Sequence, residues 1–166
     1  MQAAGSEGIA SSVANFQTKA KETMPDFRKL SSSMFASPQI GPEDIDAAKD
    51  QGIAMIVNNR PDGEEPSAPQ SDEIAALTRE AGLDYVAIPI GHSGFSEPQV
   101  DEMVAALEAA DGPVLAYCRS GTRSTFLWAL AQAKSGASPD EIVSAAMAAG
   151  YDVSPIRPML DMFAAR

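Results

Sequence analysis

The sequence predicts a single α/β domain with a central, mostly parallel sheet of four or five strands and helices on both faces. Apolar runs of strand length alternate with amphipathic segments of helix length along the 166 residues. The runs at 53–57 and 114–117 are apolar throughout, as expected for strands that are covered on both faces. A chain of this length can bury one hydrophobic core without disulfides or a structural metal.

The predicted domain begins with a hairpin, in which short strands at 27–30 and 34–36 flank three serines. Pro42 begins the next helix and Gly52 ends it, in the usual order of proline first and glycine last. The strand at 53–57 follows this helix.

A loop rich in proline, glycine and acidic residues covers 58–70. Ser71 is expected to cap a helix that ends at Gly82, because a serine side chain can accept a free N–H group of the first turn. The next strand is predicted at 85–90, and a loop at 91–95 leaves it.

Ser96 and Gln99 have the spacing of a capping box for a helix that Gly112 ends. The strand at 114–117 leads into a helix expected at about 123–135. Two further helices are predicted after it, at 138–150 and from residue 154 onwards.

Residues 1–23 are small, polar and rich in alanine and serine, and we expect them to form an N-terminal extension. Ile9, Val13, Phe16 and Ala20 recur at helical spacing. The extension could be a frayed tail, a helix docked on the body, or a helix that joins two copies in a homodimer.

Composition excludes several classes of function. The single cysteine excludes an intramolecular disulfide framework, and a single histidine, His92, argues against a structural zinc site. The net charge of −11 argues against nucleic-acid and anionic membrane partners. There is no apolar run of membrane-spanning length and no typical signal peptide. We therefore predict a cytoplasmic protein with no metal and no cofactor.

The stretch YCRSGTRS, residues 117–124, follows the last predicted strand and contains the only cysteine, Cys118. Ligands of parallel sheets bind beyond the carboxyl ends of the strands. There, the N–H groups of a tight loop and a helix N-terminus form an anion cradle. The residues predicted to line this cradle are Arg119, Ser120, Gly121, Thr122 and Ser124.

An anion cradle would favour the thiolate form of Cys118, which could then attack phosphorus or sulfur. The alternative is an inert buried cysteine at the end of a strand. The concentration of glycine, serine and two arginines at one strand-to-helix junction favours the cradle.

The segment VLAYCRSGTRST resembles the signature of cysteine-dependent phosphatases of the dual-specificity type. The segments IVNNRP, YVAIPI and GPVLAYC occur in the order found in that family. Together with IVNNRPDGEEP, they look like the phosphatase-like domain of bacterial beta-lactamase-hydrolase-like proteins. The resemblance implies a protein tyrosine phosphatase-like topology, a catalytic domain at 24–166, Cys118 as the nucleophile and Arg123 as the residue that holds the phosphoryl group.

Two features depart from the phosphatase pattern. Four residues separate Cys118 from Arg123, where the phosphatases have five. The shorter loop resembles that of rhodanese-type sulfurtransferases, in which the cysteine carries a persulfide. Tyr117 also stands where a histidine usually precedes the phosphatase cysteine.

The second departure is that the aspartate expected after the YVAIPI strand is missing. His92 in that loop is the candidate general acid, because histidine titrates near neutral pH, although it could also be an ordinary loop residue. Asp62, Glu64 and Glu65 are substitute acids. Arg60 and Asp62 are expected around the anion site, although Arg60 to Gly63 could equally form a plain turn.

The sequence thus leads to three hypotheses. The first is a cysteine-dependent phosphatase-like hydrolase. The second is a rhodanese-like sulfurtransferase with a persulfide on Cys118. The third is a non-catalytic module that binds anions or phosphopeptides. Each hypothesis implies a small anionic substrate or ligand, either a phosphorylated compound or a donor of sulfane sulfur.

Overall fold

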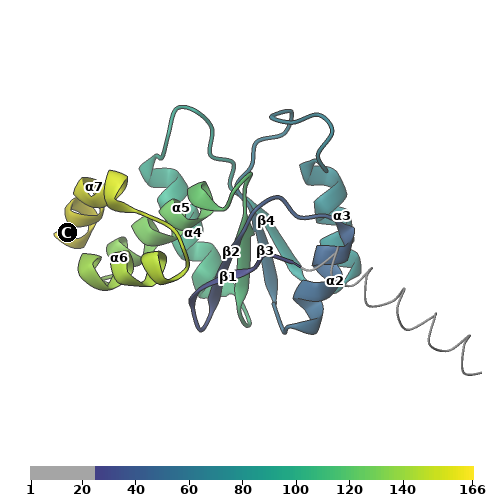
Figure 1. The fold of residues 1–166 in the computed structure, drawn as a ribbon, viewed down its shortest axis with the longest axis horizontal. Helices are drawn as coiled ribbons and strands as arrows, with labels where there is room; N and C mark the ends of the chain where they lie inside the picture. Colours follow the sequence, from purple (N-terminus) through teal and green to yellow (C-terminus); the bar gives the residue numbers. More distant parts are fainter. Residues whose placement is uncertain (1–24) are drawn as a thin grey trace, which may run out of the picture.

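The computed structural model describes residues 25–166, which form one five-stranded sheet with helices on both faces (Figure 1). The strand order is β1-β2-β5-β3-β4. Only β1 is antiparallel to its neighbour, and the other three pairings are parallel. The predicted mostly parallel sheet is therefore confirmed. The strands are β1 (Arg28–Ser31), β2 (Met34–Ser37), β3 (Met55–Asn58), β4 (Asp84–Ala87) and β5 (Val114–Tyr117).

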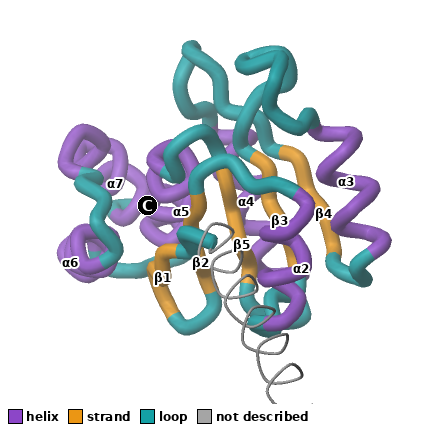
Figure 2. Tube along the Cα trace, turned by 45° about the vertical axis from the view of Figure 1, so that its right-hand side comes forward, coloured by secondary structure: helices purple, strands orange, loops and turns teal. Residues whose placement is uncertain are grey.

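The helices form two layers (Figure 2). One layer covers one face of the sheet with α2 (Pro42–Asp50) and α3 (Ser71–Glu80). The other layer contains α4 (Glu97–Ala109), α5 (Thr122–Lys134), α6 (Pro139–Ala148), the short 3-10 helix η1 (Ser154–Ile156) and α7 (Arg157–Ala164).

Strand β5 lies in the middle of the sheet and is buried along its whole length. Val114 and Ala116 pack into the core beneath α4 and α5, whereas Leu115 and Tyr117 pack into the core beneath α2 and α3. The alternation is that of a strand whose successive side chains point to opposite faces. The continuous apolar run in the sequence therefore reflects two cores that share one strand.

Strand β4 is shorter than predicted, because it ends at Ala87. Its pairing nevertheless continues irregularly beyond that residue, where the Ile88 N–H donates to Asn58 O and the Ile90 N–H to Asn59 O, each at 2.9 Å. Pro89 between them has no N–H group to donate, which interrupts the regular ladder.

Two predicted helix starts can be compared directly with the structure. The capping box of α4 is confirmed: the Ser96 N–H donates to Gln99 Oε1 at 2.8 Å, and the Gln99 N–H donates to Ser96 Oγ at 3.4 Å. The prediction that Ser71 caps α3 is wrong. Gln70 is the N-cap residue, and Asp62 Oδ1 accepts the Ser71 N–H at 2.8 Å.

The predicted N-terminal extension, its helix and any homodimer formed through it lie outside the described residues. Within 25–166, no helix is long and apolar enough to cross a membrane.

Candidate active site

Several loops meet at the carboxyl edge of the sheet. The loops that follow β3 and β4 rise above this edge, next to the turn between β5 and α5 (Figure 1). Residue Gln39, just after β2, also reaches this region, because its N–H donates to Arg119 O at 3.3 Å. Segments that are distant in the sequence therefore surround one point beyond the end of β5.

Residues Cys118 to Arg123 are called the cysteine loop below. Cys118 is 1% exposed, and its Sγ accepts a hydrogen bond from the Gly121 N–H at 3.1 Å. Gly121 has φ +93°, a left-handed conformation that glycine adopts readily, and it is the N-cap of α5. The thiol therefore lies beneath the first turn of a helix, as the sequence predicted.

The cysteine loop has its carbonyl groups turned outward. Arg119 O accepts the Gln39 N–H at 3.3 Å, and Ser120 O accepts the Tyr151 hydroxyl at 3.1 Å. In a trans peptide the carbonyl and the next N–H point in opposite directions. The N–H groups of Ser120 and Gly121 consequently point toward the inside of the loop.

The start of α5 offers further donors. The N–H groups of Arg123 and Ser124 make no hydrogen bond to the described part of the chain, as is usual in the first turn of a helix. The N-terminal end of a helix dipole also favours negative charge. The loop can therefore hold an anion next to the Cys118 sulfur.

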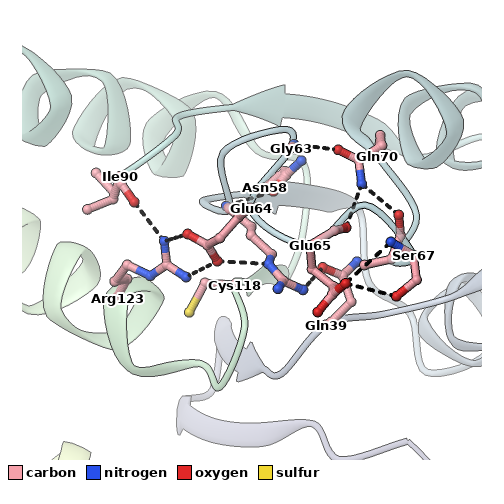
Figure 3. Close-up of polar contacts among 12 residues, drawn as sticks. Gln39, Asn58, Gly63, Glu64, Glu65, Ser67, Gln70, Ile90, Cys118 and Arg123 are labelled. Carbon is pink, nitrogen blue, oxygen red and sulfur yellow. Dashed lines mark hydrogen bonds and ion pairs between the residues drawn. The ribbon is translucent and has the colours of Figure 1, made fainter. Parts of the chain in front are cut away.

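Arg123 and Glu64 form a two-pronged ion pair beside Cys118 (Figure 3). Arg123 Nη1 and Nη2 donate to the two oxygens of Glu64 at 2.8 and 2.7 Å. Nη1 also donates to Ile90 O at 2.8 Å. The pair fixes the guanidinium between the loop that follows β3 and the loop that follows β4.

Glu64 remains ionised at neutral pH. Hydrogen bonds from Arg123, and to a smaller extent from Arg60, lower the pKa of Glu64 from 4.5 to about 2 against the effect of burial. The same ion pair raises the pKa of Arg123. A carboxylate in this environment cannot act as a general acid, so the structure removes Glu64 from the candidate acids of the sequence.

Arg60 reaches the site through Glu64. Its Nε donates to Glu64 Oε1 at 2.9 Å, and its Nη1 donates to Gln39 Oε1 at 3.0 Å. Asp62, which was expected around the anion site, instead accepts the N–H of Ser71. The structure therefore places Arg60 behind the Arg123–Glu64 pair and Asp62 at the start of α3.

His92 lies at the rim of an open pocket of about 430 Å³. Its neighbours around this pocket are Glu64, Gly91, Arg119 and Arg123. His92 and Arg119 are exposed. The pocket thus brings the predicted acid and both arginines of the cysteine loop together, and an anionic group that enters it meets these cationic side chains.

The hydroxyl groups of the cysteine loop have distinct partners. Ser120 Oγ donates to Thr122 Oγ1 at 3.0 Å and lies at the surface. Ser124 is fully buried, and its Oγ donates to Asn59 Oδ1 at 2.8 Å. Asn59 in turn donates to Ile88 O at 2.8 Å. Ser124 therefore ties α5 to the end of β3.

Tyr117 points away from the thiol, into the core beneath α2 and α3. Its hydroxyl group has no hydrogen-bond partner among residues 25–166, and burial raises the pKa of Tyr117. Tyr117 also lines a small cavity together with residues of the loop that follows β3.

Sequence reasoning missed the importance of three residues. Glu64 was named only as one of several acids, Asn59 was not singled out, and Tyr151 lies in a different part of the chain. The NNRP segment carried a local signal for Asn59, since asparagine is mostly exposed and this one directly follows an apolar strand. Within 25–166, the structure contains no cluster of three or more residues that could hold a metal ion.

A family model and several curated proteins match this chain. The family model of the beta-lactamase hydrolase-like protein, phosphatase-like domain, matches residues 26–135. A beta-lactamase hydrolase-like protein of Xylella fastidiosa is 36% identical over 104 residues, which are 62% of this chain and 24% of that protein. The chain spans about a quarter of the length of the curated relatives that it matches.

Among solved structures, a candidate phosphatase from Neisseria meningitidis superposes with a TM-score of 0.74 and 34% identity, covering 83% of this chain and 98% of that one. Tk-PTP in its active form superposes with a TM-score of 0.65 and 19% identity, covering 86% and 99%. The topology is that of the protein tyrosine phosphatases, as predicted. Because the family model matches more than half of its residues, the chain belongs to the family of the phosphatase-like domain of beta-lactamase hydrolase-like proteins.

Proposed function

We propose that the protein is a cysteine-dependent phosphatase-like hydrolase in which Cys118 is the nucleophile. The observation that carries this proposal is the cysteine loop itself. It places a buried sulfur 3.1 Å from an inward N–H group, under the first turn of α5 and beside Arg123. Membership of a phosphatase-like family supports a phosphate ester as the substrate class.

In the first step, the Cys118 thiolate attacks phosphorus, so that a bond between sulfur and phosphorus forms as the ester bond to the leaving oxygen breaks. The loop N–H groups and Arg123 stabilise the negative charge on the phosphoryl oxygens. Water then attacks phosphorus, the bond to sulfur breaks, and inorganic phosphate leaves with the thiolate restored.

The leaving oxygen needs a proton, and His92 is the residue that we assign to this role. It lines the same pocket as Arg123 and carries an imidazole, the side chain that most often serves as a general acid in enzymes. We expect His92→Gln to lower the rate of hydrolysis far more for esters with poor leaving groups than for aryl phosphates. An aryl oxide can leave without full protonation, so it depends less on a general acid.

Sulfur transfer is the second candidate function, and the short cysteine loop, with four residues between Cys118 and Arg123, favours it. The contacts with Glu64 and Ile90 leave Nε and the second N–H of Nη2 free, so Arg123 can still hold an anion through that edge. A sulfane sulfur carries less charge and needs no general acid. The thiolate would attack the outer sulfur of thiosulfate, release sulfite, and pass the sulfur atom to an acceptor nucleophile.

One pair of assays distinguishes the two chemistries. The purified protein is incubated with aryl phosphates, and phosphate release is measured. It is incubated separately with thiosulfate in the absence of any acceptor thiol, and the mass of the peptide that contains Cys118 is measured. Cys118→Ser is the control in both assays, because it keeps the side-chain size and removes the thiolate.

Phosphate release that Cys118→Ser abolishes is the expected result. A Cys118 peptide that gains one sulfur atom, with no phosphate release from any ester, would replace the proposal with sulfur transfer. Anion binding without turnover in either assay, lost in Arg123→Ala, would show a binding module.

A further inference from the structure

Tyr151 connects the C-terminal part of the chain to the cysteine loop. It follows α6, is 6% exposed, and donates its hydroxyl hydrogen to Ser120 O at 3.1 Å. The contact is close: a Cβ atom at Gly121 would lie 2.1 Å from the Tyr151 hydroxyl oxygen. The loop and this hydroxyl group therefore fit together only when residue 121 has no side chain.

Tyr151 is held both at its backbone and at its ring. Its backbone N–H donates to Ala146 O at 2.9 Å. The Arg28 guanidinium lies 5.1 Å from the centre of the ring, a cation–π distance. Arg28 is held in turn by Asp26 through hydrogen bonds of 3.2 and 3.3 Å. These contacts restrain the backbone and the ring of Tyr151, which present the hydroxyl group to the loop.

The hydrogen bond to Ser120 O affects the orientation of the N–H group that donates to the thiol. The carbonyl of Ser120 and the N–H of Gly121 belong to one planar trans peptide and point in opposite directions. With the carbonyl bound to Tyr151, the N–H points at Cys118 Sγ. Ser120 O accepts no other hydrogen bond from the described residues, so the Tyr151 hydroxyl restrains the carbonyl side of this peptide.

We propose that Tyr151 is a positioning residue, which orients the Ser120–Gly121 peptide so that its N–H stabilises the Cys118 thiolate. The inference rests on the proposed role of Cys118 as a nucleophile, but it holds for either phosphoryl or sulfur transfer. Tyr151 is not among the residues that line the pocket of His92 and Arg123.

The test is a pH titration of the thiolate, followed by its ultraviolet absorbance with the Cys118→Ser protein subtracted. In Tyr151→Phe the ring remains and only the hydroxyl group is lost. Loss of one aligned hydrogen bond should move the midpoint of thiolate formation upward by about half to one pH unit. Tyr85→Phe is the matched control, because its hydroxyl group bonds to Ser71 Oγ and to Asn58, away from the cysteine loop.

The Gly121 amide gives a second readout that does not depend on activity. Its hydrogen exchange, followed by NMR, should become faster in Tyr151→Phe and stay unchanged in Tyr85→Phe. An unchanged midpoint and unchanged exchange in a folded Tyr151→Phe protein would overturn the inference while leaving the proposed function intact. A wild-type thiol that ionises like free cysteine would overturn both.

Discussion

Glu64 sets the electrostatics of the candidate site. It is the carboxylate that both Arg123 and Arg60 contact, and its low pKa makes it a permanent negative charge there. The site therefore combines a thiol, an inward-facing ring of N–H groups and an arginine that is already paired. A substrate must share Arg123 with Glu64 or replace it.

The low pKa of Glu64 predicts a pH-dependent contribution to stability. A group whose folded pKa lies below its unfolded value stabilises the fold above the unfolded pKa, and that contribution is lost as the pH falls through the folded pKa. The difference in melting temperature between wild type and Glu64→Gln should therefore be constant above about pH 5 and shrink between pH 4.5 and about 2.

The control for this measurement is Glu102→Gln, an exposed position on α4 with no ion pair among the described residues. Thermal unfolding followed by circular dichroism gives both differences. A Glu64→Gln difference that is independent of pH would contradict the ion pair.

The shape of the Arg123 side chain should matter as well as its charge. Arg123→Lys keeps the positive charge but cannot contact Glu64 with two nitrogens and Ile90 O at once. We expect kcat to fall by about 100-fold or more, as when one donor to a transition state is lost. Arg119→Lys, at the exposed rim of the same pocket, should change mainly KM.

At the level of elements, the cysteine loop depends on a glycine. Gly121→Ala would place a methyl group against the Tyr151 hydroxyl in a left-handed conformation, so the loop must move. We expect a loss of about 1–3 kcal/mol of unfolding free energy, measured by urea denaturation, together with loss of activity.

Gly136→Ala separates the two causes of that loss, which are backbone strain and the clash with the Tyr151 hydroxyl. Gly136 has φ +103°, but a Cβ atom added there would meet no other atom within 4 Å, so the substitution adds only backbone strain. It should cost less than Gly121→Ala and leave activity unchanged. Equal effects of the two substitutions would contradict the proposed contact with Tyr151.

The sequence predicted the elements of the fold well and the contacts of the site only in part. Continuous apolar runs such as 114–117 and the capping box at Ser96 are local signals, and the structure confirms both. The pairing of Glu64 with Arg123 depends on how two loops meet, and no local pattern encodes it. The same holds for Tyr151, which reaches Ser120 from across the fold.

At the level of the whole molecule, the last helices are part of the same folded unit. The family model ends at residue 135, yet α7 packs on α5, and residues of both lie in one core. Tyr151 lies in this C-terminal part and contacts the cysteine loop. The segment after residue 135 therefore contributes to the site as well as to the core.

Leu160→Ala tests whether the C-terminal helices unfold together with the rest of the domain. Leu160 on α7 is fully buried, so its truncation should cost about 2–5 kcal/mol of unfolding free energy. Met162→Ala on the same helix removes a side chain of a residue that is 48% exposed and should cost far less. Both proteins should unfold in one urea transition. A separate early transition in Leu160→Ala would show that the C-terminal helices form an independent unit.

In the proposed reaction, Cys118 forms a covalent bond with the group that it transfers. The most direct measurement is rapid acid quenching during turnover of an aryl phosphate, followed by mass spectrometry of the peptide that contains Cys118. We expect one phosphoryl group on that peptide in the wild-type protein and none in Cys118→Ala. An unmodified Cys118 peptide during active turnover, or turnover that survives Cys118→Ala, would contradict it.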